Sequence, residues 1–106
     1  MARKEFETLT VQMYYILLVL TKPRHGYEIM NEIWNMTEGH VQVGAGTLYT
    51  LLSRFESEGY IRLDTIIDRK KIYIITSLGI KKLKEETQRL SMQVLHYKEV
   101  FKDEEI

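Results

Sequence analysis

Residues 40–60 read HVQVGAGTLYTLLSRFESEGY, with two glycines, Gly44 and Gly46, immediately ahead of an amphipathic run. Glycines before a helix can cradle a phosphate, allow a sharp turn, or let the backbone lie close to another molecule. A phosphate cradle would indicate a nucleotide enzyme, whereas close approach of the backbone is typical of a binding module. The surrounding residues decide between these alternatives.

The glycine pair lacks the other parts of a nucleotide-binding motif. GAG is followed by TLY without a third glycine, the preceding EGHVQV is a poor buried strand, and the Lys-Ser/Thr of a Walker loop is missing. His25, His40 and His96 fall in separate segments without ligand-like spacing, and there is no cysteine. The adjacent pair Glu85 and Glu86 points in two directions on a helix and is expected to be solvated. We therefore expect no enzyme activity, no cofactor and no metal site.

The amphipathic run predicts a helix from about Thr47 to Gly59. Gly59 stands where a glycine in the left-handed region ends a helix. One face is apolar and carries Leu48, Leu51, Leu52 and Phe55. The opposite face is polar, carries no acid, and consists of Thr47, Thr50, Arg54 and Ser57.

Two helices are expected before this stretch, and a hairpin and a helix after it. The helices cover about residues 8–20, where Pro23 follows, and 26–36. The segment YIRLDTIIDRKKIYII predicts a β-hairpin with a charged tip near residues 68–71, with Ile72 and Ile74 facing the core. Thr76 or Ser77 can cap a last helix over about residues 78–101.

The last helix carries a seam typical of a coiled coil. Its positions alternate in steps of three and four across three heptads, which predicts a homodimer. A chain of 106 residues also buries a modest share of its surface, which favours association. The expected dimerisation residues are Ile80, Leu83, Thr87, Leu90, Val94, Tyr97 and Phe101.

The element order is that of a winged helix-turn-helix. We predict a mainly α (α+β) fold with a two-stranded β wing and a long C-terminal dimerisation helix. Residues 1–76 would form the DNA-binding domain and residues 77–106 the dimerisation helix. The third helix would enter the DNA groove through Thr47, Thr50 and Arg54, and Gly44 and Gly46 would let the backbone turn sharply and approach DNA closely. The wing would contribute Arg69, Lys70 and Lys71.

Charge leaves a second interpretation open. The chain has 15 basic and 15 acidic residues, and this neutrality favours a winged-helix protein-interaction module with no specific DNA target. However, Arg69, Lys70, Lys71, Lys81, Lys82 and Lys84 lie in one stretch without an acid, which predicts a basic edge.

The lengths of the apolar runs indicate the cellular compartment in which the protein is expected. The longest apolar run, residues 13–20, is far shorter than a membrane span, and the first residues lack the apolar core of a signal peptide. We expect a soluble, cytoplasmic protein with no membrane partner.

HGYEIMNEI at residues 25–33 and VGAGTLYTLLSRFESEGYI at residues 43–61 together resemble the PadR-like family of bacterial transcriptional regulators. The resemblance covers about residues 8–80 and is to members with a short C-terminal helix. It implies a winged helix-turn-helix, a homodimer held by the last helix, and repression of nearby genes. Tyr27, Thr47 and Tyr49 match the family's polar and aromatic residues near DNA, and Arg54 matches its recurrent basic residue.

Some short members of this family bind flat aromatic compounds at the dimer interface through a tryptophan on the last helix. The only tryptophan here, Trp34, lies in the second predicted helix, where we expect it to pack against the first or last helix. The sequence therefore leaves a small-molecule effector open without supporting one. The prediction is a sequence-specific DNA-binding regulator, a repressor, that binds double-stranded DNA at an inverted repeat as a homodimer.

Overall fold

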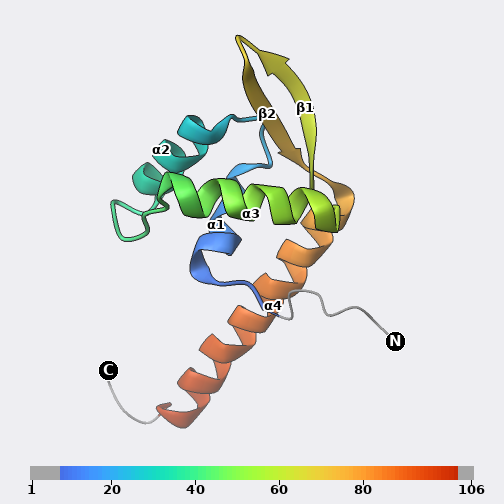
Figure 1. The fold of residues 1–106 in the computed structure, drawn as a ribbon. Helices are drawn as coiled ribbons and strands as arrows, with labels where there is room; N and C mark the ends of the chain where they lie inside the picture. Colours follow the sequence, from blue (N-terminus) through green and yellow to red (C-terminus); the bar gives the residue numbers. More distant parts are fainter. Residues whose placement is uncertain (1–7, 103–106) are drawn as a thin grey trace.

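The computed structural model describes residues 8–102 of the chain. Figure 1 shows a compact helical body from which the hairpin projects at one end, while the last helix extends away at the other. The two strands form one antiparallel sheet, so the predicted winged helix-turn-helix is confirmed. In chain order the elements are α1 (Val11–Val19), α2 (Gly26–Met36), α3 (Ala45–Glu58), β1 (Ile61–Ile67), β2 (Lys70–Ile75) and α4 (Ser77–Val100).

One hydrophobic core joins the three helices of the body, the base of the wing and the first half of α4. The apolar face predicted for α3 is the buried one, because residues three and four apart share a helix face. Fully or almost fully buried side chains include Ile16, Leu17, Leu20, Ile29, Ile33, Leu48, Leu52, Phe55 and Ile61.

Local hydrogen bonds set where the helices begin and end. The hydroxyl of Thr10 accepts the backbone N–H of Met13 at 3.2 Å, so α1 begins after Thr10 rather than at residue 8. Gly44 is the N-cap of α3, which therefore begins two residues earlier than predicted. Gly59, at φ +84°, ends α3 in the left-handed region as expected. Thr76 caps α4 by accepting the N–H of Gly79 at 3.1 Å.

The wing is anchored to the body on its outer edge. The N–H of Ile75 donates to the carbonyl of Leu20 at 2.8 Å, and Tyr73 and Arg24 exchange backbone hydrogen bonds of 2.9 and 3.1 Å. Tyr73 and Ile75 consequently face the helices and are buried, while Ile72 and Ile74 are half-buried, so the predicted inward pair was wrong by one residue. Because strand side chains alternate, this shift exchanges the two faces of β2.

Trp34 does not pack against α1 or α4 as the sequence suggested. It is 48% exposed, because Ile29 and Ile33 occupy the core side of α2. The indole instead lies against Gly39 in the following loop, where φ is +81° and a Cβ would come within 3.1 Å of the ring. An aromatic side chain is thus held at the surface.

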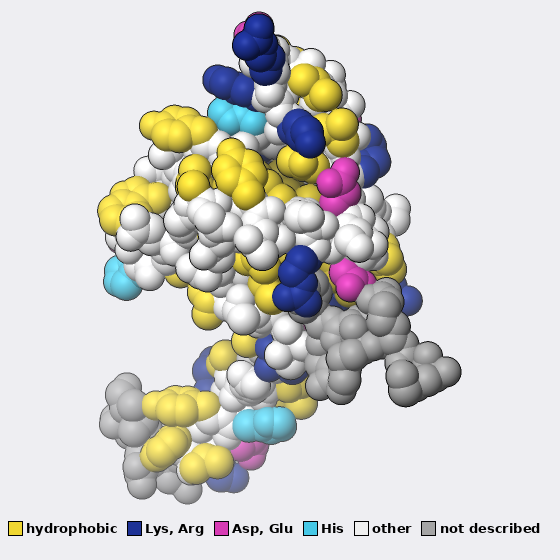
Figure 2. All heavy atoms as spheres, viewed as in Figure 1, with side chains coloured by type: hydrophobic (Ala, Val, Ile, Leu, Met, Phe, Trp, Pro, Cys, Tyr) yellow, Lys and Arg dark blue, Asp and Glu magenta, His cyan; other side chains and the backbone are white. Residues whose placement is uncertain are grey.

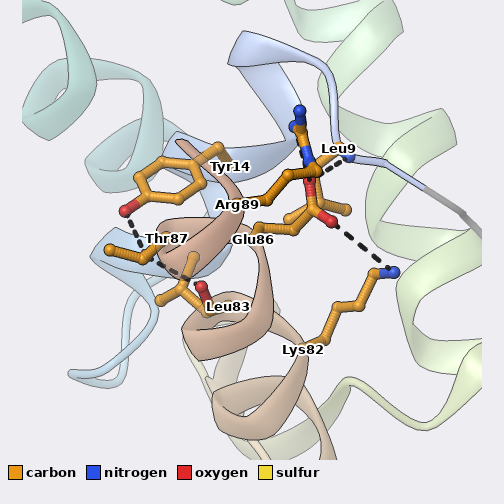
Figure 3. Close-up of polar contacts among 7 residues, drawn as sticks. All are labelled: Leu9, Tyr14, Lys82, Leu83, Glu86, Thr87 and Arg89. Carbon is orange, nitrogen blue, oxygen red and sulfur yellow. Dashed lines mark hydrogen bonds and ion pairs between the residues drawn. The ribbon is translucent and has the colours of Figure 1, made fainter. Parts of the chain in front are cut away.

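A buried carboxylate joins α4 to the segment before α1 (Figure 3). Glu86 is 3% exposed, contrary to the expected solvation, and its Oε1 accepts the backbone N–H of Leu9 at 2.8 Å and the guanidinium of Arg89 at 2.9 Å. Lys82 Nζ lies 3.9 Å from the other carboxylate oxygen. Burial alone would raise the pKa of Glu86, but the hydrogen bonds from Arg89 and Leu9 and the charges of Arg89 and Lys82 lower it.

Two positions of the predicted dimerisation seam are used within the chain itself. Leu83 is buried in the core, and the hydroxyl of Thr87 lies 2.6 Å from the phenol oxygen of Tyr14 on α1. These side chains hold α4 to its own body. From Leu90 to Val100 every residue of α4 is exposed, so the second half of the helix leaves an uncovered apolar surface.

Candidate nucleic-acid interface

The outward face of α3 is a ridge of small residues. Gly46, Thr50, Ser53 and Ser57 follow one another at spacings of four, three and four along the helix, and all are exposed. They lie opposite the buried side chains of Leu48, Leu52 and Phe55. We call these four residues the outer ridge. Nothing bulky on it would keep the helix from entering a groove, and three hydroxyls are offered for hydrogen bonds.

Ser53 belongs to this ridge although it is not among the DNA-contacting residues predicted from the sequence. The same helical spacing that selected Thr50 and Ser57 places Ser53 between them, so the signal was present. Thr47 and Arg54 lie on one flank of the ridge, and Tyr49 and Glu56 lie on the other; all four are exposed.

The packing of residues 8–102 does not require a glycine at either position at the start of α3. Gly44 has φ −77° and ψ 161°, an extended conformation open to any residue, and Gly46 lies in the first helical turn. A Cβ at either position would meet nothing within 4 Å. The sharp, glycine-dependent turn predicted from the sequence is therefore wrong. What remains is the close approach of another molecule to the α3 N-terminus, where unpaired N–H groups favour a phosphate.

A cleft of about 580 Å³ separates α3 from the wing. Tyr27 and Tyr49 line it from the helices, and Arg69, Lys70 and Lys71 line it from the wing, so five predicted DNA-contacting residues come together. The tip carries its cations on a tight turn in which Asp68 and Arg69 have φ of +51° and +67°. Tyr49 lies over Gly26, where a Cβ would be 2.3 Å from the phenol oxygen, so that glycine makes room for it.

An acid also lines this cleft. The predicted outward face of α3 contained none, but Glu56 lies on the flank toward the wing, among the cleft residues. Burial, followed by the negative charge of Glu56 and then Tyr49, raises the pKa of the Tyr73 phenol at the cleft floor. The cleft is thus basic at its rim and carries a single carboxylate on its helix wall.

Figure 2 shows this side of the molecule. Lys and Arg side chains gather at the top of the view, over the wing. Apolar side chains lie at the upper left of the view, over α2. The pattern places cations at one border of the candidate interface and apolar side chains at another. Phosphates attract the first, and sugars and base edges can contact the second.

The described part of the chain was also compared with the requirements of a metal site and of a membrane-spanning helix. Between residues 8 and 102 there is no group of three or more His, Asp or Glu side chains that could hold a metal ion. Within the same residues, no helix combines the length and apolar character needed to cross a bilayer.

Comparison with known proteins adds to this geometry. Residues 16–85 match the model of the transcriptional regulator PadR-like family. The chain belongs to the PadR-like family. It is therefore a transcriptional regulator rather than an enzyme, and the resemblance seen in the sequence is confirmed.

Individual proteins resemble the chain in fold or in sequence. A transcriptional regulator from Clostridium thermocellum superposes with a TM-score of 0.70 at 27% identity, covering 88% of this chain and 90% of that one. A PadR-like transcriptional regulator from Bacillus cereus gives a TM-score of 0.70 at 24% identity, over 85% and 90% of the two chains, and so shares the fold. An uncharacterized protein of Lysinibacillus sphaericus is 41% identical over 66 residues, which span 58% of this chain and 61% of that protein's length.

Proposed function

We propose that this PadR-like regulator binds a specific DNA duplex as a homodimer. In this proposal the outer ridge of α3 lies in the major groove, Thr47 and Arg54 contact it from one flank, and the wing cations contact a neighbouring phosphate backbone. Tyr27 and Tyr49 complete the surface from the cleft. Occupying an operator in this way would block transcription, so we assign the protein as a repressor.

The observation that carries the proposal is the open space around Gly44 and Gly46. Gly46 lies inside α3, where glycine costs about 0.5–1 kcal/mol relative to alanine and so needs a compensating reason. Neither the backbone angles nor the packing of this chain supplies one. A DNA backbone lying against the α3 N-terminus would supply it, because any side chain there would hold the duplex away.

The exposed surface of α4 supports the homodimer. Contiguous exposed apolar side chains on a small protein mark an interaction site. Pairing would cover them, set two α3 helices about 34 Å apart, and require an inverted-repeat operator. We retain Ile80, Leu90, Val94, Tyr97 and Phe101 as interface residues, of which all but the half-buried Phe101 are exposed in the single chain. Residues 77–106 are then the dimerisation segment and residues 1–76 the DNA-binding domain.

A second function has one observation in its favour. Glu56 stands in the cleft between α3 and the wing, and the chain has no net positive charge. Both suit a winged-helix module that binds another protein rather than specific DNA.

A gel shift of the full chain on the DNA upstream of its own gene separates the two functions. We expect a saturable shift that Arg54→Ala weakens without altering the melting temperature. Lys98→Ala is the control, because Lys98 lies near the far end of α4. A chain that shifts specific and random duplexes equally would favour the protein-interaction module.

A further inference from the structure

A strip of α2 begins at Tyr27, at the edge of the proposed DNA surface, and continues through Asn31 and Trp34, which have no assigned role. Tyr27, Asn31 and Trp34 are spaced i, i+4 and i+7 and therefore share one side of the helix. All three are exposed, Tyr27 by 65%. They border a groove of about 390 Å³ whose floor is made by Met30 and the buried Val43, with Gln42 at the rim. We call these three residues the aromatic strip.

Two of its lining residues connect the groove to the candidate interface. Tyr27 lines both this groove and the cleft beside the wing. Val43 immediately precedes Gly44, the N-cap of α3. A strand of DNA lying against the α3 N-terminus and the cleft would therefore pass beside the aromatic strip.

The groove is held in shape before any partner arrives. The hydroxyl of Thr37 donates to the carbonyl of Ile33 at 2.8 Å and accepts the N–H of Val41 at 3.0 Å, which folds the loop back on α2. The side chain of Gln12 donates to the carbonyl of Gln42 at 2.9 Å, which fixes the rim. Packing of the indole against Gly39 restricts Trp34. Little ordering entropy would oppose binding there.

The chemistry of the groove suits a phosphodiester backbone. Its lining has no charge, and it offers the donors of Asn31, Gln42, Trp34 and Tyr27. The acids of α2 are engaged elsewhere: Glu28 accepts the N–H of His25 at 3.0 Å, and Glu32 lies 3.9 Å from Arg24. Neutral donors commonly position DNA by contacting phosphate and sugar.

We infer that the aromatic strip is an uncharged second contact to the sugar-phosphate backbone, with Asn31 and Trp34 holding the strand that passes the α3 N-terminus. The inference rests on the proposed function, since it needs a bound duplex. It predicts a contact that strengthens binding without releasing counterions, unlike the contacts of the wing.

Trp34 reports on this contact directly because it is the only tryptophan in the chain. The probe is a duplex selected from a random library by the full chain, and saturation is followed independently by gel shift. We expect acrylamide quenching of Trp34 to fall severalfold in the saturated complex. Unchanged quenching in a complex that the gel shows to be saturated would overturn the inference while leaving DNA binding intact.

Substitution of Asn31 tests whether the strip contacts DNA directly or whether a duplex bound nearby only shields Trp34 from the quencher. Asn31→Ala should weaken binding of the selected duplex about two- to tenfold, the range for one lost hydrogen bond, with the salt dependence unchanged. Asn35→Ala is the matched control, because Asn35 is exposed on the same helix and lies outside the groove lining. Wild-type affinity of Asn31→Ala would overturn the backbone contact inferred for Asn31. If the library yields no duplex, the proposed function falls and this inference falls with it.

Discussion

The carboxylate of Glu86 accepts the backbone N–H of Leu9 across 77 positions of sequence, at 2.8 Å, and both residues are buried. This bond ties the start of the helical body to the middle of α4. The neighbouring contact of Tyr14 with Thr87 adds a second link between α1 and α4. The direction in which α4 leaves the body, and hence the placement of two DNA-binding domains in the proposed dimer, depends on these contacts.

Replacing the carboxylate should destabilise the fold. Glu86→Gln keeps an acceptor for Leu9 but leaves Arg89 and Lys82 without their counter-charge, so we expect a loss of about 1–3 kcal/mol in the free energy of unfolding. Urea denaturation measures it. Glu85→Gln, an exposed neighbour, should change stability by less than about 0.5 kcal/mol. Equal stability of the two variants would show that Glu86 has no structural role.

The contribution of Glu86 to the free energy of unfolding should also depend on pH. Its pKa is lowered in the folded chain, so the unfolded chain binds this proton more readily and stability falls as pH drops. The contribution should be complete above the ordinary carboxyl pKa of about 4.3 and fade as the pH falls from there through the folded pKa. The stability gap between wild type and Glu86→Gln, measured by urea denaturation along a pH series, should therefore narrow on acidification. A gap that widens would contradict the assignment.

Replacing Gly46 with alanine should raise the stability of the fold but weaken DNA binding. Because a Cβ there meets nothing within 4 Å, Gly46→Ala should stabilise the helix by about 0.5–1 kcal/mol. On our account it should nevertheless weaken operator binding, since the added methyl meets the duplex. Gly79→Ala is the contrasting variant, because its Cβ would lie 2.2 Å from the Tyr60 carbonyl oxygen and should destabilise the fold. Calorimetry and fluorescence anisotropy measure the two effects.

Placing a charge on the exposed half of α4 should produce monomers. Val94 is 53% exposed in the single chain, so Val94→Glu should leave the body folded while disrupting the proposed pairing. Sedimentation equilibrium should show a dimer for wild type and a monomer for the variant, with similar circular dichroism. Lys98→Glu on the same helix provides a charge-change control. A wild-type chain that sediments as a monomer would rule out the pairing.

The wing cations should act through salt-dependent phosphate contacts. Arg69→Ala should weaken binding and reduce the slope of log affinity against log salt by about 0.9 for each lost phosphate contact. Binding isotherms at several salt concentrations give that slope. Arg62→Ala serves as control, because Arg62 lies at the base of the wing and pairs with Asp64 at 3.4 Å. An unchanged slope for Arg69→Ala would place the tip away from DNA.

The sequence predicts the element order and the buried face of α3, because apolar residues recur there with the 3.6-residue period of a helix. It could not orient β2, where IYII is apolar on both sides and only the bonds to Arg24 and Leu20 decide the register. Heptad spacing likewise could not separate packing within a chain from packing between chains. Leu83 and Thr87 satisfy the pattern but contact their own body.

The candidate site was partly predictable for similar reasons. Helical spacing and the family resemblance pointed to the face of α3, and the charged tip of the predicted hairpin pointed to the wing. Sequence could not show that Glu56 joins the cleft or that Trp34 stays at the surface, since both depend on how the loop after α2 and the wing fold back. Glu86 was misjudged because only the tertiary fold supplies Leu9 as its partner.

Recognition of a specific operator by a homodimer can be tested by selecting duplexes from a random library with the full chain and sequencing them. We expect enrichment of an inverted repeat whose half-sites lie about 10 base pairs apart, bound by two chains per duplex. No enrichment, or a single half-site bound by one chain, would contradict it.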